Sequence, residues 1–194
     1  MAKVYGQLAV LGLMVASLSA CQSIDTVRVK HVKETQSTES NALIFCAGTE
    51  QCEFERLDQI HIVDAQSHRL SREAIQQGIV RLKAKSLNEA NPLFLSVPTG
   101  QHELVIRFYP ISKDRAETLH VFHNFNSQKH YTFKMYRDRT HHKGNLLNAS
   151  APDPLCVELQ QEQKTIRRFC KPYNVLNGLG EFVEQKNLKS PSVK

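Results

Sequence analysis

The chain has 194 residues, of which 41% are hydrophobic and 23% are charged, and its formal net charge is +6. This composition excludes collagen-like, coiled-coil and strongly disordered chains. It is typical of one domain of ordinary size that is large enough to bury a hydrophobic core.

The first twenty residues have the pattern of a secretory signal peptide. Lys3 supplies a positive start, an apolar stretch covers residues 8–18, and the small residues Ser19 and Ala20 follow. The apolar stretch is shorter than the roughly 20 residues that a spanning helix needs. We therefore expect residues 1–20 to be a leader that is removed, with an N-terminal membrane anchor or a buried helix as the alternatives.

The end of this leader resembles a bacterial lipobox, with the motif Leu18-Ser19-Ala20-Cys21. The resemblance implies cleavage before Cys21, a diacylglycerol on its thiol and an acyl group on its amine. Several acyl chains anchor a protein stably, whereas one chain alone binds marginally. Lipoproteins that are retained in the inner membrane typically carry an Asp directly after the lipidated Cys, and this chain has Gln22 there. The resemblance therefore implies the outer membrane, with the domain in the periplasm or at the cell surface.

Residues 22–41 are polar and contain few large apolar side chains. Such a composition does not form a core. We expect residues 21–41 to be the lipidated Cys followed by a flexible tether, with a reach of roughly 25 Å.

The remaining cysteines indicate an oxidising compartment. Without Cys21 there are four, an even number that predicts two disulfides in an exported chain. Three pairings are possible, and proximity in the sequence favours Cys46–Cys52 and Cys156–Cys170. A zinc site is the alternative, although none of the four has the CxxC spacing of such sites.

Alternating apolar and polar residues predict a β-rich domain over residues 42–175. The predicted strands cover residues 42–46, 52–55, 59–63, 80–85, 93–97, 102–109, 118–125, 130–137, 156–159 and 166–170. In residues 80–85 the basic side chains fall on the side expected to face water. Ser71 and Gly78 bound one predicted short helix, and residues 176–194 are expected to be mainly a loose C-terminal tail.

Turn residues predict how some strands connect. Pro98 and Gly100 predict a tight turn from which residues 102–109 return. The last two strands predict a hairpin in which Cys156 faces Cys170 and Glu158 faces Arg168. Directly opposed residues lie close enough for a disulfide and an ion pair.

The middle of the domain contains the segments SVPTGQHELVIRF and HVFHNFNSQKHYTFKMY. They resemble the PEGA-type small β-sandwich of bacterial envelope proteins, with matching positions at Gly100, His102, Leu104, Ile106, Tyr131, Phe133 and Met135. The resemblance implies a fold rather than a reaction. Together with the strand pattern it predicts a mainly β protein, an antiparallel β-sandwich with one short helix.

Motifs of known catalytic sites are absent from the sequence. It contains no nucleophile elbow, no HExxH and no phosphate-binding loop. Glu53 and Glu55 share a strand face, and Asp58 and Asp64 flank the next strand, but solvent-exposed strand charges are the favoured interpretation. We expect no enzyme and no cofactor, with a cell-wall-acting enzyme as the less favoured alternative.

Five of the nine histidines lie close together in the sequence, at positions 120, 123, 130, 141 and 142. If residues 118–125 and 130–137 form a hairpin, His123 and His130 meet near its turn, and with His141 and His142 they are candidate ligands for zinc or copper. A metal site needs convergent ligands held by supporting hydrogen bonds. Scattered surface histidines are therefore the favoured interpretation.

Basic residues recur in three rows, within residues 81–85, 134–143 and 164–171. Solvated strand faces explain such rows in most proteins, and outside the cytoplasm nucleic acid is not an expected partner. The sequence thus predicts a lipid-anchored envelope protein that acts as a non-enzymatic interaction or scaffolding module with an envelope protein partner. The alternative is a lipoprotein that binds a metal or an anionic envelope polymer.

Overall fold

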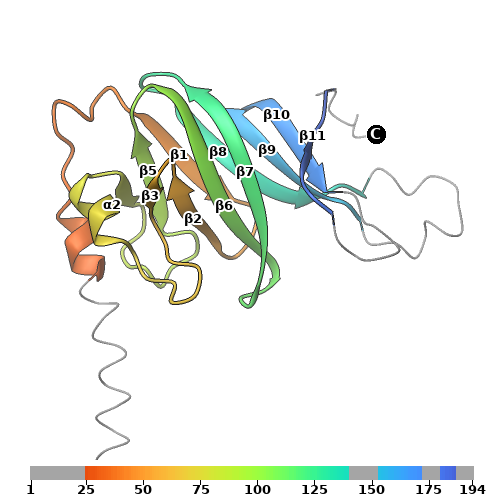
Figure 1. The fold of residues 1–194 in the computed structure, drawn as a ribbon, viewed down its shortest axis with the longest axis horizontal. Helices are drawn as coiled ribbons and strands as arrows, with labels where there is room; N and C mark the ends of the chain where they lie inside the picture. The colour runs from red at the N-terminus through yellow and green to blue at the C-terminus, as the bar shows by residue number, and fades with distance from the viewer. Residues whose placement is uncertain (1–24, 140–152, 172–179, 187–194) are drawn as a thin grey trace, which may run out of the picture.

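The structure, a computed structural model, describes residues 25–139, 153–171 and 180–186. They form two β-sheets packed against each other, with two short helices at one side (Figure 1). The predicted mainly β sandwich is confirmed. Cys21, His141 and His142 lie outside the described residues.

The larger sheet has seven strands in the order β11-β10-β9-β8-β1-β5-β4. These are β1 (Ala42–Ala47), β4 (Val80–Leu82), β5 (Leu93–Val97), β8 (His130–Arg137), β9 (Leu155–Gln161), β10 (Lys164–Lys171) and β11 (Val183–Glu184). Neighbouring strands are antiparallel, except that β1 and β8 run parallel. The parallel pair differs from the purely antiparallel sandwich that the sequence predicted.

The smaller sheet has four antiparallel strands in the order β3-β2-β6-β7. These are β2 (Cys52–Leu57), β3 (Ile60–His61), β6 (Gly100–Ser112) and β7 (Arg115–Phe125). The long hairpin of β6 and β7 forms most of this sheet.

The two helices are short. The first is described over residues 25–30, which the sequence pattern did not predict as helix, and α2 (Arg72–Gln76) lies within the predicted segment 71–78. Ser71 accepts a hydrogen bond from the backbone N–H of Ala74, so it caps α2 as expected. Within the described residues, no helix is long and apolar enough to cross a membrane.

One hydrophobic core lies between the sheets. The alternation of side chains along each strand sends every second residue inward. The largest fully buried side chains are Tyr131, Phe54, Phe108, Phe125 and Phe133, which come from β8, β2, β6 and β7. Both sheets therefore contribute aromatic rings to the same core.

The strands on either side of the predicted Pro98–Gly100 turn belong to different sheets, and so do the two strands that were considered as a histidine-bearing hairpin. β5 lies in the larger sheet and β6 in the smaller one, so the turn at Pro98–Gly100 carries the chain across the sandwich edge. β7 and β8 are divided in the same way. Turn residues predict that the chain reverses, but both a hairpin and a crossing between sheets satisfy them.

The predicted flexible tether over residues 22–41 is wrong from residue 25 onward. Val29 is 2% exposed within the core, and Val32 packs against the core. The Asn41 side chain donates a hydrogen bond of 3.0 Å to Ser96 Oγ. Two apolar residues and one buried amide therefore suffice to dock this segment against the sandwich.

Arg81 of β4 fastens the same segment from the other side. Its guanidinium donates to the carbonyl oxygens of Gly78 (2.9 Å) and Val32 (3.0 Å), and the residue is buried. Burial lowers the pKa of Arg81. The expectation that this basic side of the strand faces water is therefore wrong for Arg81, whose charge is used to bind backbone carbonyls.

Part of the C-terminal segment forms a strand. β11 pairs with Phe169 and Cys170 of β10, although residues 176–194 were expected to be mainly a loose tail. Residues 187–194 lie outside the described part of the chain.

Gly48 allows the turn after β1 to approach β8. Its φ is +93°, and a Cβ at this position would lie 2.0 Å from the carbonyl oxygen of Met135. We predict that Gly48→Ala lowers the free energy of unfolding by more than the ~1–3 kcal/mol of the backbone conformation alone, as measured by denaturant titration. The control is Gly78→Ala, at φ +69° with no contact nearer than 3.6 Å; an equal loss in both variants would contradict the close approach.

Candidate functional site

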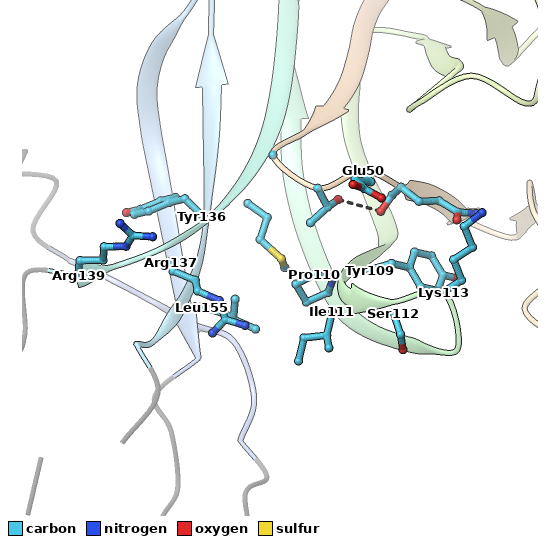
Figure 2. Close-up of a pocket in the computed structure, with 14 residues that line it drawn as sticks. Glu50, Tyr109, Pro110, Ile111, Ser112, Lys113, Tyr136, Arg137, Arg139 and Leu155 are labelled. Atoms are coloured by element: carbon cyan, nitrogen blue, oxygen red, sulfur yellow. Dashed lines mark hydrogen bonds between the residues drawn. The ribbon is translucent and has the colours of Figure 1, made fainter. Parts of the chain in front are cut away.

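A groove with a volume of about 670 Å³ opens between the turn that joins β6 to β7 and the ends of β8 and β9 (Figure 2). It is lined by residues 48–51, 109–113, 135–137, 139 and 155. Figure 2 shows Tyr136 and Arg139 on one side and Glu50, Tyr109 and Lys113 on the other. Both sheets contribute to its walls.

Each wall of the groove adjoins a disulfide. Cys46–Cys52 closes the loop whose residues 48–51 line one wall. Cys156–Cys170 links β9 to β10, and Cys156 lies opposite Tyr136 of the other wall. Both pairings agree with those favoured by the sequence, and the predicted register of Cys156 with Cys170 and of Glu158 with Arg168 is confirmed.

The groove combines apolar side chains with cations. Pro110, Met135 and Leu155 supply apolar surface, and the Ile111 residue is 70% exposed. The cations are Lys113, Arg137 and Arg139, against the single lining carboxylate of Glu50. An extended segment with apolar and acidic side chains matches this surface, because charge complementarity favours the approach of an acidic partner.

A buried charge cluster lies behind Tyr109. Glu53 is 8% exposed and its Oε2 accepts hydrogen bonds from the Tyr109 hydroxyl (2.8 Å) and from Arg107 (3.0 Å). Its Oε1 lies 2.9 Å from His68 Nδ1 and accepts from Gln51 Nε2 at 3.1 Å. The expectation of solvent-exposed strand charges is therefore wrong for Glu53.

Arg107 lies opposite Glu53 across the β2–β6 ladder and is 5% exposed. Its Nε is 3.4 Å from Glu55 Oε2 but has no hydrogen-bond partner there. Another guanidinium nitrogen lies 3.4 Å from the carbonyl oxygen of Asp64. One buried cation thus faces two carboxylates and a carbonyl, which compensates for much of its lost hydration.

The carboxylate of Glu53 holds neighbouring side chains in place and is not free to react. A carboxylate has about four lone-pair sites, and four side chains engage Glu53. Burial, and then the hydrogen bond to Glu53, raise the pKa of Tyr109. Tyr109 therefore stays neutral, with its hydroxyl held at Glu53 while the residue lines the groove.

The segment 62–70 explains why sequence reasoning missed this cluster. Val63 and Leu70 pair across it, and it brings His68 and the Asp64 carbonyl onto the outer face of the smaller sheet. Strand alternation identifies one face as polar, but it carries no sign that a loop covers that face. The adjacent polar positions Glu53 and Arg107 become informative only once β2 and β6 are known to pair.

The candidate metal ligands have different surroundings. His123 is half-buried, and its ring centroid lies 4.9 Å from that of Phe125 and 5.4 Å from that of Tyr131. Burial, with a contribution from the charge of Arg167, lowers the pKa of His123. His130 is exposed and lies 3.6 Å from Glu162. The structure describes no group of three or more His, Cys, Asp or Glu side chains that could hold a metal in residues 25–139, 153–171 and 180–186.

No protein-family model matches the chain, and neither the curated proteins nor the solved structures contain a match.

Removing the charge of Glu53 tests the cluster. We predict that Glu53→Gln lowers the free energy of unfolding by about 3 kcal/mol, because it leaves Arg107 buried without its closest carboxylate. The matched control is Glu55→Gln, whose side chain is 30% exposed and makes no hydrogen bond to Arg107. We expect less than about 1 kcal/mol there. Equal losses by denaturant titration would contradict the assigned roles.

The raised pKa of Tyr109 predicts a loss of stability in alkali. Above about pH 10 the unfolded phenol releases its proton while the folded phenol keeps it, so the unfolded state binds fewer protons and stability falls as pH rises. Burial also raises the pKa of Tyr136, to about 12, which adds to the same trend.

We predict that Tyr109→Phe makes the loss of stability from about pH 9 to pH 11 smaller than in the parent protein. Short denaturant titrations at each pH measure it. An unchanged slope would show that Tyr109 is not held neutral by the cluster.

Proposed function

We propose that the protein is a lipid-anchored envelope protein that acts as a non-enzymatic interaction module, and that its groove binds an extended segment of an envelope protein partner. The observation that carries the proposal is the groove itself, an apolar surface bordered by Lys113, Arg137 and Arg139. Its walls adjoin both disulfides, so the surface is preorganised, which reduces the entropy lost when a partner binds.

The compartment is supported by two independent features. Disulfides persist in oxidising compartments and are rare in the cytosol, and both Cys46–Cys52 and Cys156–Cys170 join described strands or their ends. The leader and the lipobox-like motif before Cys21 provide the route and the anchor. Anchoring raises the effective concentration of the groove at the membrane.

Site-specific photo-crosslinking in the native envelope tests this function. We predict that a photoreactive residue at Ile111, which is 70% exposed in the groove, captures one dominant partner protein. The matched control is Phe122 of β7, which is 60% exposed and does not line the groove. A second control is Cys21→Ser, which we expect to lack acyl label and to lose most of the crosslink.

Three outcomes would contradict the proposal. Capture of the same protein with equal yield from Ile111 and Phe122 would show that the groove does not direct binding. Capture of glycan or lipid alone at Ile111 would favour the anionic-polymer alternative, which the three groove cations also suit. Continued acyl labelling of Cys21→Ser would remove the assigned anchor.

A further inference from the structure

The docked N-terminal segment leaves very little chain between the proposed anchor and the folded body. Three residues, and therefore four residue-to-residue steps, separate Cys21 from Asp25, which is the first described residue of the first helix. A fully extended chain covers at most about 3.6 Å per residue, so this link spans no more than about 14 Å. If Cys21 carries the lipid, the helix at residues 25–30 is held close to the bilayer.

The helix presents one side to the core and another to solvent. Val29 is 2% exposed, whereas Val27 is 53% exposed. Two positions along a helix correspond to a rotation of about 200°, so Val27 points away from the body. An exposed apolar side chain next to a membrane anchor is in position to contact lipid.

A basic hollow of about 350 Å³ adjoins the same helix. Its lining includes Asp25 and Arg28 from the first helix, His61 and Asp64, Arg69 from the segment that leads into α2, and Arg72, the first residue of α2. Figure 1 shows this helix beside α2, on the side of the sandwich away from β11. Residues distant in the sequence thus converge beside the point where the chain arrives from its anchor.

The two acidic residues of the hollow are largely engaged. Asp25 lies 3.5 Å from Arg28, and one carboxylate oxygen of Asp64 accepts hydrogen bonds from the backbone N–H groups of Gln66 and Ser67 and from the Ser67 hydroxyl. The guanidinium groups of Arg69 and Arg72 have no hydrogen-bond or ion-pair partner among the described residues. Two cations are therefore available to an anion.

We propose that this hollow binds the phosphate of an anionic phospholipid headgroup and so orients the anchored domain with Val27 against the bilayer. Arginine suits phosphate because its planar guanidinium donates two parallel hydrogen bonds. The short link to Cys21 selects a lipid phosphate as the occupant, since it places the hollow at headgroup level. The inference rests on the lipid anchor of the proposed function, but not on the groove.

The absence of tryptophan from the chain allows a direct test. The lipidated Val27→Trp protein, reconstituted in vesicles with brominated acyl chains, carries a single reporter on the helix. We expect its fluorescence to be quenched, and more strongly when phosphatidylglycerol is added to phosphatidylcholine. The control is Phe122→Trp, an exposed position on β7, which should not be quenched.

The soluble Cys21→Ser, Val27→Trp protein measures the hollow without the anchor. An arginine near an anionic surface contributes about a fivefold gain in affinity. We therefore expect Arg69→Gln with Arg72→Gln to weaken binding to phosphatidylglycerol vesicles about 25-fold. The matched control is Lys129→Gln with Lys164→Gln, which removes the same charge from exposed positions near other turns and should weaken binding far less. Added salt should weaken the parent protein's binding.

The outcomes separate this inference from the anchor. Failure of the lipidated protein to float with vesicles would overturn the anchor, while the soluble variants still test the hollow. Flotation without quenching at Val27→Trp would overturn the proposed orientation. Equal losses from the arginine and lysine pairs, or equal quenching in neutral and anionic vesicles, would overturn the headgroup site. If neither aqueous iodide nor the brominated lipid quenches the fluorescence of the Val27→Trp variant, a protein and not the bilayer covers this face, and the proposed orientation is overturned.

Discussion

Strand β6 is buried on both of its faces, and the packing of both sheets follows from this burial. Its inner face supplies Leu104, Ile106 and Phe108 to the core, and its outer face carries Arg107 and Tyr109, which are also buried. A buried arginine is tolerated only with compensating charges and hydrogen bonds. Glu53 on the neighbouring strand supplies them, and this pairing fixes the register of β2 and β6 at Glu53 and Arg107, ahead of the register shift between Phe54 and Arg56.

The groove follows from this arrangement. Tyr109 is held by its hydroxyl at Glu53 and by its backbone N–H at the Gln51 carbonyl (3.1 Å), so the disulfide-closed loop and β6 are fixed relative to each other. The opposite wall is fixed by the pairing of β8 with β9 and by Cys156–Cys170. A surface made by two rigid walls suits recognition, because little conformational entropy is lost when it is occupied.

Most of the fold could be predicted from the sequence, because strand alternation is a local signal. The register of the β9–β10 hairpin was predicted correctly, because the disulfide Cys156–Cys170 and the ion pair Glu158–Arg168 require the same alignment of the two strands. The sequence did not predict that β5 and β6 belong to different sheets, because this depends on which distant strands each of them pairs with. The burial of Glu53 and Arg81 depends in the same way on segments that lie elsewhere in the sequence.

Local sequence signals also failed to predict that residues 25–41 dock onto the sandwich. Their composition indicated a tether, yet Val29, Val32 and Asn41 each meet a specific partner. These three contacts and the hydrogen bonds from Arg81 hold residues 25–41 in place, where a flexible tether was expected. If Cys21 carries the proposed lipid anchor, this docking shortens the link to the membrane and restricts the orientation in which the groove is presented.

The most direct test of the central claim is intact mass spectrometry of the protein isolated from the envelope with its free thiols blocked. We predict a chain that begins at Cys21, carries the mass of three acyl chains and glycerol, and has four unblocked cysteines paired as Cys46–Cys52 and Cys156–Cys170. A chain that retains residues 1–20, has no lipid and has all five cysteines blocked would contradict export, anchoring and the disulfide-supported groove together.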